Sequence, residues 1–481
     1  MRGCLRFCAV LLCGWAVVSL GEPPAPTTPL VLTQLPHGAG NGAARDRLDL
    51  YYPAGSRVVV AAAPWSAPTV RVLSEGFYAA GGPVVSFDGE RVYFAGKTGA
   101  DGDWQIYEVG VGGNHRRAVT AIAGGAGAPA LLADGSVVFA SPLPRVGQPV
   151  GSVPLSQLYA QLPGGQPRRL TFGSVGIADP TVLPDGRVLF VSATPAGPTG
   201  PARGLSLFTI NNDGTEMTAF ACQHDPPAVI GRPRLLADGR VAFLASKLDS
   251  AVAEDSAESV RMARPFLSRT NLFPGLKARV RSLGPDGESS LLVCAQRPPS
   301  SWTVYRAREN EGTLGAPLFE DAQWDCVEAV AARASQRPMG RLSSMDSAKK
   351  TGQILCLNAN ETTYSSGGTP TGAAATRVRV LAELAPGRCR TLGEVPVQSD
   401  GSFMAEVPAD TPLGFEALNQ EGEVLRRVEP IVWVRPGENR SCTGCHAAHN
   451  RAPHNHRPLA VYATVPCLGA EAELSQAPKA P

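Results

Sequence analysis

An Asp-Gly turn followed by an alternating apolar strand recurs through the first two thirds of the chain. The turns begin at Asp88, Asp134, Asp185 and Asp238, with a weaker copy at Asp286, so successive copies lie 46, 51, 53 and 48 residues apart. Asp-Gly is a frequent hairpin turn because glycine adopts positive φ readily. A second turn follows most copies, at Gly112-Gly113, Gly164-Gly165, Asp213-Gly214 and Glu311-Gly312. Each unit therefore predicts two hairpins, or four short strands.

Four strands in about 50 residues are typical of one blade of a β-propeller. We expect a propeller over residues 47–357 with six blades, and seven as the alternative. The segment Leu48–Ala62 reads as a strand that completes the final blade near Cys326–Leu357. Residues 249–270 contain no clear strand and are interpreted as an insertion. The repeated aspartates are predicted to form turns rather than to act in catalysis.

The composition supports many short strands and gives no charged surface. The chain has 52 glycines and 43 prolines in 481 residues, with 44 Lys and Arg against 42 Asp and Glu, a formal net charge of +2. A nearly neutral chain without a run of like charges gives no argument for nucleic acid or for an anionic membrane as a partner.

The N-terminus has the pattern of a secretory signal peptide. Arg2 and Arg6 precede an apolar run from Phe7 to Leu20, and the small residues Ser19 and Gly21 stand before a cleavage site at residue 22. We therefore expect a signal peptide at 1–21, a Pro- and Gly-rich linker at 22–46, and a periplasmic or otherwise exported protein. Contact with a membrane is expected only through the signal segment, if it stays uncleaved.

After the repeat the sequence pattern changes to short candidate strands about ten residues apart. These candidate strands are Thr376–Glu383, Leu392–Val397, Ser402–Val407, Gly414–Leu418 and Val424–Pro430. Such spacing predicts a small β-rich, sandwich-like domain over 358–436. We expect a haem-binding segment at 437–470 and a disordered tail at 471–481 to follow it. Because the propeller and the small domain are both built from strands, the predicted fold class is all-β.

Residues 442–446 form the pattern C-x-x-C-H, with Cys442, Cys445 and His446. Two thiols at this spacing can each bond to one vinyl group of a haem, and the adjacent histidine then becomes the proximal ligand of the iron. The alternatives are a redox pair, half of a zinc site, or a disulfide. Because we expect the protein to be exported, we favour one covalently attached haem c over these alternatives.

The second axial ligand is less defined. His449 lies too close to His446 to cross the haem, whereas His454 or His456 could loop around it. Without such a ligand the iron would be five-coordinate and open to a small gas. Six further cysteines outside the signal peptide are free to form disulfides or to be small buried residues: Cys222, Cys294, Cys326, Cys356, Cys389 and Cys467.

Several local sequences together resemble proteins related to the hydrazine synthase alpha subunit. They are Asp325-Cys326-Val327-Glu328, Arg337-Pro338 with Gly340-Arg341, Thr351 to Asn358, Ser399 to Phe403, Val407 to Pro412, and Arg435-Pro436-Gly437-Glu438 leading into Cys442. The resemblance implies a TolB-like propeller, a β-rich region and a C-terminal haem c motif used in electron transfer, matched here by Cys442, Cys445 and His446. The family's enzyme carries its catalytic haem on a second C-x-x-C-H, and this sequence has one.

The sequence therefore predicts an exported monohaem c-type cytochrome that transfers electrons to a redox partner protein, with the propeller as a docking scaffold. A haem enzyme acting on a small nitrogen or oxygen species is the first alternative. A secreted propeller that binds peptide or glycan is the second. Whether the protein is an enzyme stays open.

Overall fold

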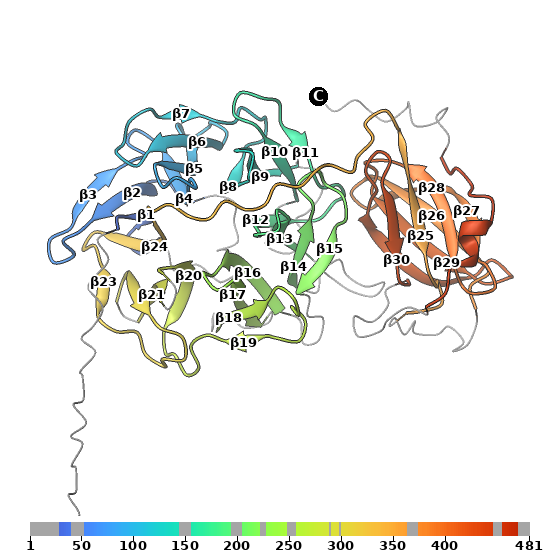
Figure 1. Cartoon of the computed structure of the whole chain (residues 1–481). Helices are drawn as coiled ribbons and strands as arrows, with labels where there is room; N and C mark the ends of the chain where they lie inside the picture. Colours follow the sequence, from blue (N-terminus) through green and yellow to red (C-terminus); the bar gives the residue numbers. More distant parts are fainter. Residues whose placement is uncertain are drawn as a thin grey trace, which may run out of the picture.

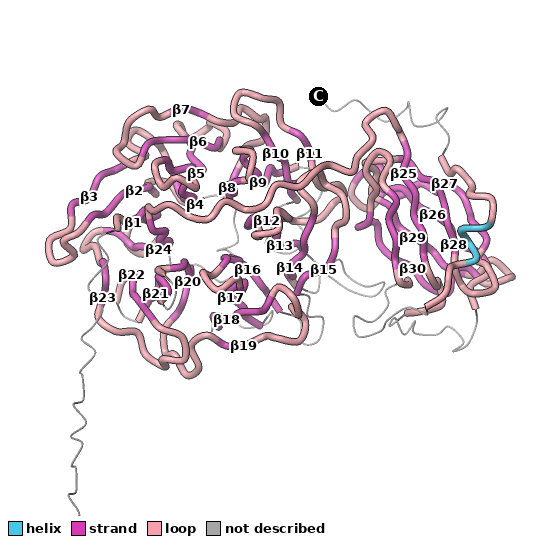
Figure 2. The backbone as a smooth tube through the Cα atoms, viewed as in Figure 1, coloured by secondary structure: helices cyan, strands magenta, loops and turns pink. Residues whose placement is uncertain are grey.

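The computed structural model describes residues 28–39, 52–143, 155–193, 204–221, 228–247, 256–287, 290–297, 300–362, 374–445 and 455–469. Apart from one short 3-10 turn, η2 (Leu459–Tyr462), the regular structure in these ranges is β-strand. The strands form two bodies, a ring of blades and a smaller sandwich beside it (Figure 1 and Figure 2). No helix in the described ranges is long and apolar enough to cross a membrane.

Five blades of four strands follow one another along the chain; three are separate sheets, and β12–β15 and β16–β19 are joined into one sheet by a single parallel pairing between β14 and β16. Their strands are β4 (Ala79–Val85), β5 (Arg91–Lys97), β6 (Gln105–Gly110), β7 (Arg117–Ala118); β8 (Gly127–Leu131), β9 (Val137–Pro142), β10 (Ser156–Gln161), β11 (Arg168–Arg169); β12 (Ile177–Val182), β13 (Val188–Ala193), β14 (Leu205–Ile210), β15 (Thr218–Ala221); β16 (Ala228–Leu235), β17 (Arg240–Lys247), β18 (Ser256–Arg261), β19 (Thr270–Asn271); and β20 (Arg279–Pro285), β21 (Leu291–Gln296), β22 (Trp302–Ala307), β23 (Pro317–Phe319). The first strands of neighbouring blades contact one another around the ring and are therefore innermost.

The sixth blade closes the ring with strands from both ends of the propeller sequence. Its order is β24 (Trp324–Ala331), β1 (Leu30–Pro36), β2 (Arg57–Ala62) and β3 (Thr69–Val72). Leu30 pairs with Ala61 on one side and with Ala331 on the other. The described residues therefore confirm the six-bladed propeller.

Three boundaries expected from the sequence are wrong. Residues 22–46 are not all linker, because β1 lies in them and is buried between two strands. Residues 249–270 hold β18 and the first residue of β19, and the Ser- and Glu-containing sequence of β18 hides the apolar alternation. The propeller ends at Ala331 rather than 357, because the strand at 351–356 pairs with the second domain.

That second domain is a β-sandwich. One sheet has β25 (Thr351–Cys356) between β28 (Phe403–Pro408) and β31 (Asn439–Cys442); the other has β27 (Arg388–Pro396), β26 (Arg377–Ala385), β29 (Leu413–Leu418) and β30 (Val424–Val432) in that order. Side chains of both sheets, including Ile354, Phe403, Val380 and Phe415, share one buried core. This confirms the sandwich-like domain.

Residues 332–350 run as an extended strap from β24 to β25 across one face of the ring (Figure 1). The strap lies on the Asp-Gly turns: Ser335 N donates to Phe87 O at 3.0 Å, and Met339 N donates to Pro184 O at 2.8 Å. The Asp-Gly turns that mark the repeat therefore also bind the strap that connects the propeller to the sandwich.

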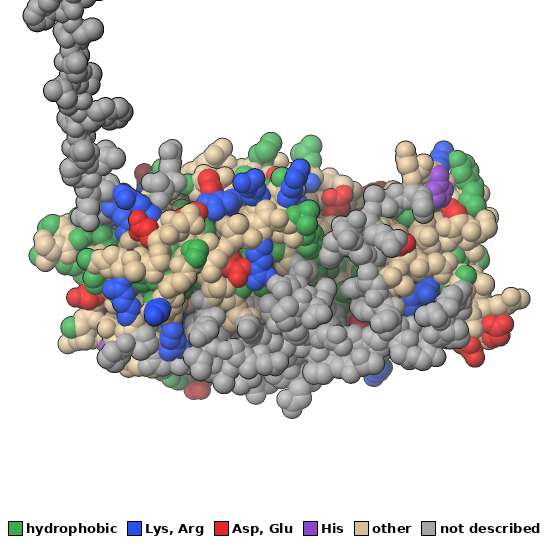
Figure 3. Space-filling view, turned by 90° about the horizontal axis from the view of Figure 1, so that it is seen from below, with side chains coloured by type: hydrophobic (Ala, Val, Ile, Leu, Met, Phe, Trp, Pro, Cys, Tyr) green, Lys and Arg blue, Asp and Glu red, His purple; other side chains and the backbone are tan. Residues whose placement is uncertain are grey.

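Basic and acidic side chains are interspersed on the face seen in Figure 3. Such a mixture agrees with the net charge of +2 for the whole chain. The signal peptide expected at 1–21 and the tail expected at 471–481 lie outside the described residues.

Candidate haem-attachment site and its supports

Strand β31 places the first cysteine of the motif at the edge of the three-stranded sheet. It runs parallel to β25, with Cys356 opposite Cys442 in the register. Leu357 N donates to Cys442 O at 2.9 Å, and Gln353 N donates to Glu438 O at 2.8 Å. The backbone that leads into the motif is therefore fixed by a regular ladder up to Cys442 itself.

Gly444, the second of the two residues between the cysteines, must be small. A Cβ atom on Gly444 would overlap the carbonyl oxygen of Glu361 and lie 3.1 Å from that of Asn358. Gly444 thus lets the chain turn tightly against the loop after β25, and this turn carries Cys445 inward, where 7% of its surface remains exposed.

Three cysteines meet at this point, and the C-x-x-C-H pattern includes two of them. Cys356, Cys442 and Cys445 are all free thiols. Cys356 and Cys445 share a thiol hydrogen bond. This bond raises the pKa of Cys356, as burial does, and lowers the pKa of Cys445 although burial opposes that effect. Burial raises the pKa of Cys442. Cys356 was only one of six unassigned cysteines in the sequence.

The donors that are described fit covalent attachment of haem. Thioether formation needs two thiols that are not consumed in a disulfide, and Cys442 and Cys445 meet this requirement. Within the described ranges no three His, Cys, Asp or Glu side chains are arranged to hold a metal ion, so these residues alone do not form a zinc site. His446, the expected proximal ligand, lies outside the described residues, as do His449 and His454.

His456 is described and already has a partner. Its Nε2 lies 3.3 Å from Asp400 Oδ2, and the same oxygen accepts a hydrogen bond from Leu459 N at 2.8 Å. Although burial opposes the effect, hydrogen bonds donated by Ser402 and Leu459 hold the pKa of Asp400 below its usual range. To reach a haem iron through Nε2, His456 must leave this carboxylate.

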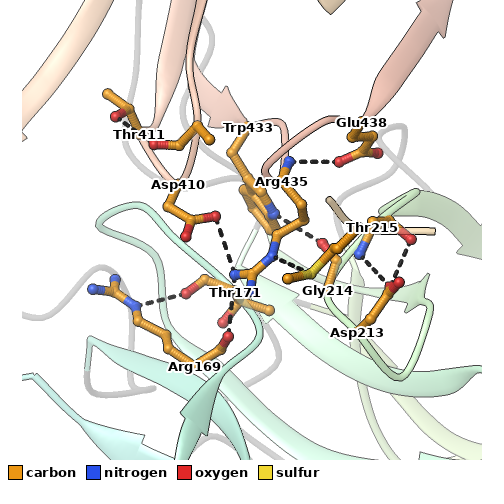
Figure 4. Close-up of polar contacts among 12 residues, drawn as sticks. Arg169, Thr171, Asp213, Gly214, Thr215, Asp410, Thr411, Trp433, Arg435 and Glu438 are labelled. Carbon is orange, nitrogen blue, oxygen red and sulfur yellow. Dashed lines mark hydrogen bonds and ion pairs between the residues drawn. The ribbon is translucent and has the colours of Figure 1, made fainter. Parts of the chain in front are cut away.

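The segment before the motif is fastened to the propeller through Arg435 and Trp433 (Figure 4). Arg435 Nη1 lies 3.2 Å from Asp410 Oδ1 and donates to Arg169 O at 3.1 Å. Trp433, 1% exposed, donates from Nε1 to Gly214 O at 3.1 Å and packs edge-on against Phe172. These contacts join β30 and the residues after it to two blades.

Glu438 adds a polar fastening four residues before Cys442. Its carboxylate accepts from Glu216 N of the propeller at 2.9 Å and from Arg435 N at 2.7 Å. Burial raises the pKa of Glu438. Arg440, within β31, donates to Met217 O of the propeller. The strand that presents the motif therefore rests directly on the β14–β15 hairpin.

A second buried cluster, around Glu328, occupies the centre of the ring. Glu328 of innermost strand β24 accepts from Thr33 Oγ1 at 2.6 Å, Tyr52 OH at 2.9 Å and Gly82 N at 3.0 Å. It also forms an ion pair with Arg232 of β16, two blades away. Asp179 Oδ2 accepts from Arg232 N at 3.0 Å.

The backbone repeats itself at this axis. Four innermost strands carry a residue of positive φ directly before a proline, at a break in the strand register: Gly82, Ala128, Asp179 and Arg232. Such bulges turn the strand and re-aim its side chains. Asp179 and Arg232 thereby become ligands of the central cluster, a role that no local sequence pattern indicated.

Together these observations define a two-part all-β protein, a six-bladed propeller joined to a β-sandwich whose edge strand ends in C-x-x-C-H. Residues 350–447 match the family model described as the hydrazine synthase alpha subunit middle domain. This stretch includes Cys442, Cys445 and His446. Over residues 350–447 the chain is thus similar to this domain of the hydrazine synthase alpha subunit, which confirms the resemblance seen in the sequence.

The structure is similar to that of Kuenenia stuttgartiensis hydrazine synthase, with a TM-score of 0.79 and 18% identity over 91% of this chain and 71% of that one. TolB from Acinetobacter baumannii has a TM-score of 0.46 and 15% identity over 65% of this chain and 68% of that one, too distant to support an argument. No curated protein sequence matches the chain. The family model that matches residues 350–447 describes a middle domain, whereas the resemblance seen in the sequence equated the C-x-x-C-H of this chain with the family's C-terminal haem motif.

Proposed function

We propose that the protein is an exported monohaem c-type cytochrome that exchanges electrons with a partner protein. Cys442 and Cys445 attach the haem, His446 is the proximal ligand, and the propeller is the docking scaffold. The observation that carries the proposal is the C-x-x-C-H at the end of β31, inside the hydrazine synthase alpha match. The bound haem supplies the one-electron chemistry.

The chain's own residues contribute position. The β25 ladder holds the motif strand in the sandwich, and the Glu438 carboxylate and the Arg440 side chain hold it against the propeller. A haem attached there has its first thioether on a fixed strand, which limits the movement of the iron relative to the propeller surface. A fixed distance to a docked partner favours electron transfer.

Intact mass and a pyridine haemochrome spectrum of the exported protein test this assignment. We expect a mass gain of one haem, lost in the Cys442→Ala/Cys445→Ala variant and kept in a Cys467→Ala control, whose exposed thiol lies outside the motif. N-terminal sequencing should begin at residue 22. A protein without haem would overturn the proposal and leave a secreted propeller that binds peptide or glycan.

A haem enzyme acting on a small nitrogen or oxygen species is the second candidate. It is favoured by the middle-domain match to a subunit of hydrazine synthase. Coordination number separates the two functions, because an enzyme needs an open site on the iron whereas a carrier does not. A six-coordinate, low-spin haem that changes in His454→Ala or His456→Ala supports the carrier; a five-coordinate haem that binds nitric oxide supports the enzyme.

A further inference from the structure

Cys356 stands beside the two attachment cysteines without a role in haem attachment. It is the last residue of β25, is 2% exposed, and lies opposite Cys442 across the parallel ladder. Its thiol shares a hydrogen bond with Cys445. Two thiols in hydrogen-bond contact are close enough for disulfide formation after a small side-chain rotation.

We propose that Cys356 and Cys445 form a disulfide in the haem-free protein, and that reduction of this bond releases Cys445 for haem attachment. The first half concerns three thiols of the chain alone; the second half rests on the proposed function. Cys445 is the partner rather than Cys442 because the thiol contact joins Cys356 to Cys445.

The surroundings of Cys356 and Cys445 favour a bond between these two cysteines over a bond to Cys442. Cys356 and Cys445 belong to the buried core of the sandwich, which fixes both side chains. The Gly444 turn holds Cys445 against the loop that follows Cys356, because Gly444 lies against the carbonyls of Asn358 and Glu361. The same fold that presents Cys442 at the sheet edge therefore directs Cys445 toward Cys356.

The oxidant is a small disulfide such as oxidised glutathione. The Cys445 sulfur attacks one of its sulfurs, forms a mixed disulfide and expels one glutathione. The Cys356 sulfur then attacks the Cys445 sulfur and expels the second glutathione. Two protein thiols become one disulfide, two electrons pass to the oxidant, and the two thiol protons end on the two glutathione molecules.

Peptide mapping of the haem-free protein, made without haem-attachment machinery, tests the first half. After treatment with oxidised glutathione and alkylation of the remaining thiols, trypsin should release residues 351–377 joined to residues 441–451, with Cys442 alkylated. The linked species should persist in Cys442→Ser and in the control Cys467→Ser, and disappear in Cys445→Ser. An alkylated Cys356, or a link confined to 441–451, would overturn the proposal.

Haem loading tests the second half. With haem-attachment machinery but no added reductant, we expect Cys356→Ser and Cys356→Ala to carry several-fold more haem than the wild type, and added reductant to remove the difference. Circular dichroism confirms folding of both variants. Equal loading of variants and wild type without reductant would overturn the gating. Loading in neither, together with a mapped disulfide, would overturn the proposed function and leave the disulfide standing.

Discussion

Glu328 shows how one side chain can hold a ring closed. It binds Thr33 of the N-terminal strand, Tyr52, the Gly82 amide and Arg232, so four separate parts of the chain meet on one carboxylate that is 3% exposed. Because the propeller is closed only by strands from its two ends, the carboxylate ties down the place where the ring would open.

We expect Glu328→Gln to destabilise the protein by about 3 kcal/mol, because the buried guanidinium of Arg232 loses one of its two acidic partners, Glu328 and Asp179. Urea unfolding followed by tryptophan fluorescence measures this. Glu311→Gln, on an exposed turn, is the control and should change stability by less than about 0.5 kcal/mol. A Glu328→Gln protein as stable as the wild type would show that the cluster does not contribute to ring closure.

The same variant should alter the response to acid. Burial would raise the pKa of Glu328, but Arg232 and the hydrogen bonds outweigh burial and lower it. The folded state therefore favours the charged form, and its stabilising contribution is complete above the ordinary value of about 4.3 and is lost as pH falls further. We expect the stability difference between wild type and Glu328→Gln to shrink below about pH 4. A difference independent of pH would contradict this.

At the residue scale, a sequence pattern can indicate only groups that lie close together along the chain. Cys442, Cys445 and His446 could be predicted as haem-attachment residues because they form one short pattern. Cys356 and Glu328 could not, because their partners lie 89 and 96 residues away, at Cys445 and Arg232 respectively. Which cysteine faces which depends on strand register, and no single-sequence pattern fixes the register of distant strands.

The same distinction holds for the strands: pairings between neighbours in sequence could be predicted, whereas pairings between distant segments could not. The Asp-Gly turns predicted the hairpins because a tight turn and its two strands are contiguous. Strands β1 and β25 were misplaced because each pairs with strands remote in sequence: β1 with β24, and β25 with β28 and β31. A buried central strand lacks the polar alternation of an exposed one, so β1 resembled a linker.

The strap offers a test at the element scale, because glycines at the same turn position meet it differently. Gly186 has a φ of +82°, and a Cβ there would overlap Met339 O of the strap. We expect Gly186→Ala to detach the strap near Met339. Trypsin should then cleave after Arg341 several-fold faster, since its side chain otherwise donates to the Asp185 carbonyl of the propeller turn.

Gly239 is the matched control for this effect. It occupies the same position in another Asp-Gly turn, with a φ of +81°, and a Cβ there would meet nothing within 4 Å. Gly239→Ala therefore carries the same backbone strain without the collision. Equal cleavage rates in both variants would mean that strain alone, and not contact with the strap, governs access to Arg341.

At the scale of the whole molecule, the position of the sandwich on the propeller depends on a small set of residues near β30 and β31. Trp433 packs in the same buried cluster as Phe172, Leu189 and Phe190 of the propeller, and Arg435 spans from Asp410 to Arg169. The motif strand begins four residues after Arg435. Any loosening of this interface therefore moves β31 and Cys442 relative to the propeller.

Trp433→Ala should separate the two domains. Removing a buried indole costs about 3–5 kcal/mol and leaves Gly214 O without its donor. We expect calorimetry to resolve a transition for the sandwich below that of the propeller. Trp433→Phe keeps a ring against Phe172 and loses only the hydrogen bond. This variant should therefore lose about 1 kcal/mol of stability and, like the wild type, show no separate transition for the sandwich. A single transition at the wild-type temperature in Trp433→Ala would show that the strap and the Glu438 and Arg440 contacts suffice to couple the domains, and that the indole is dispensable for placing the motif.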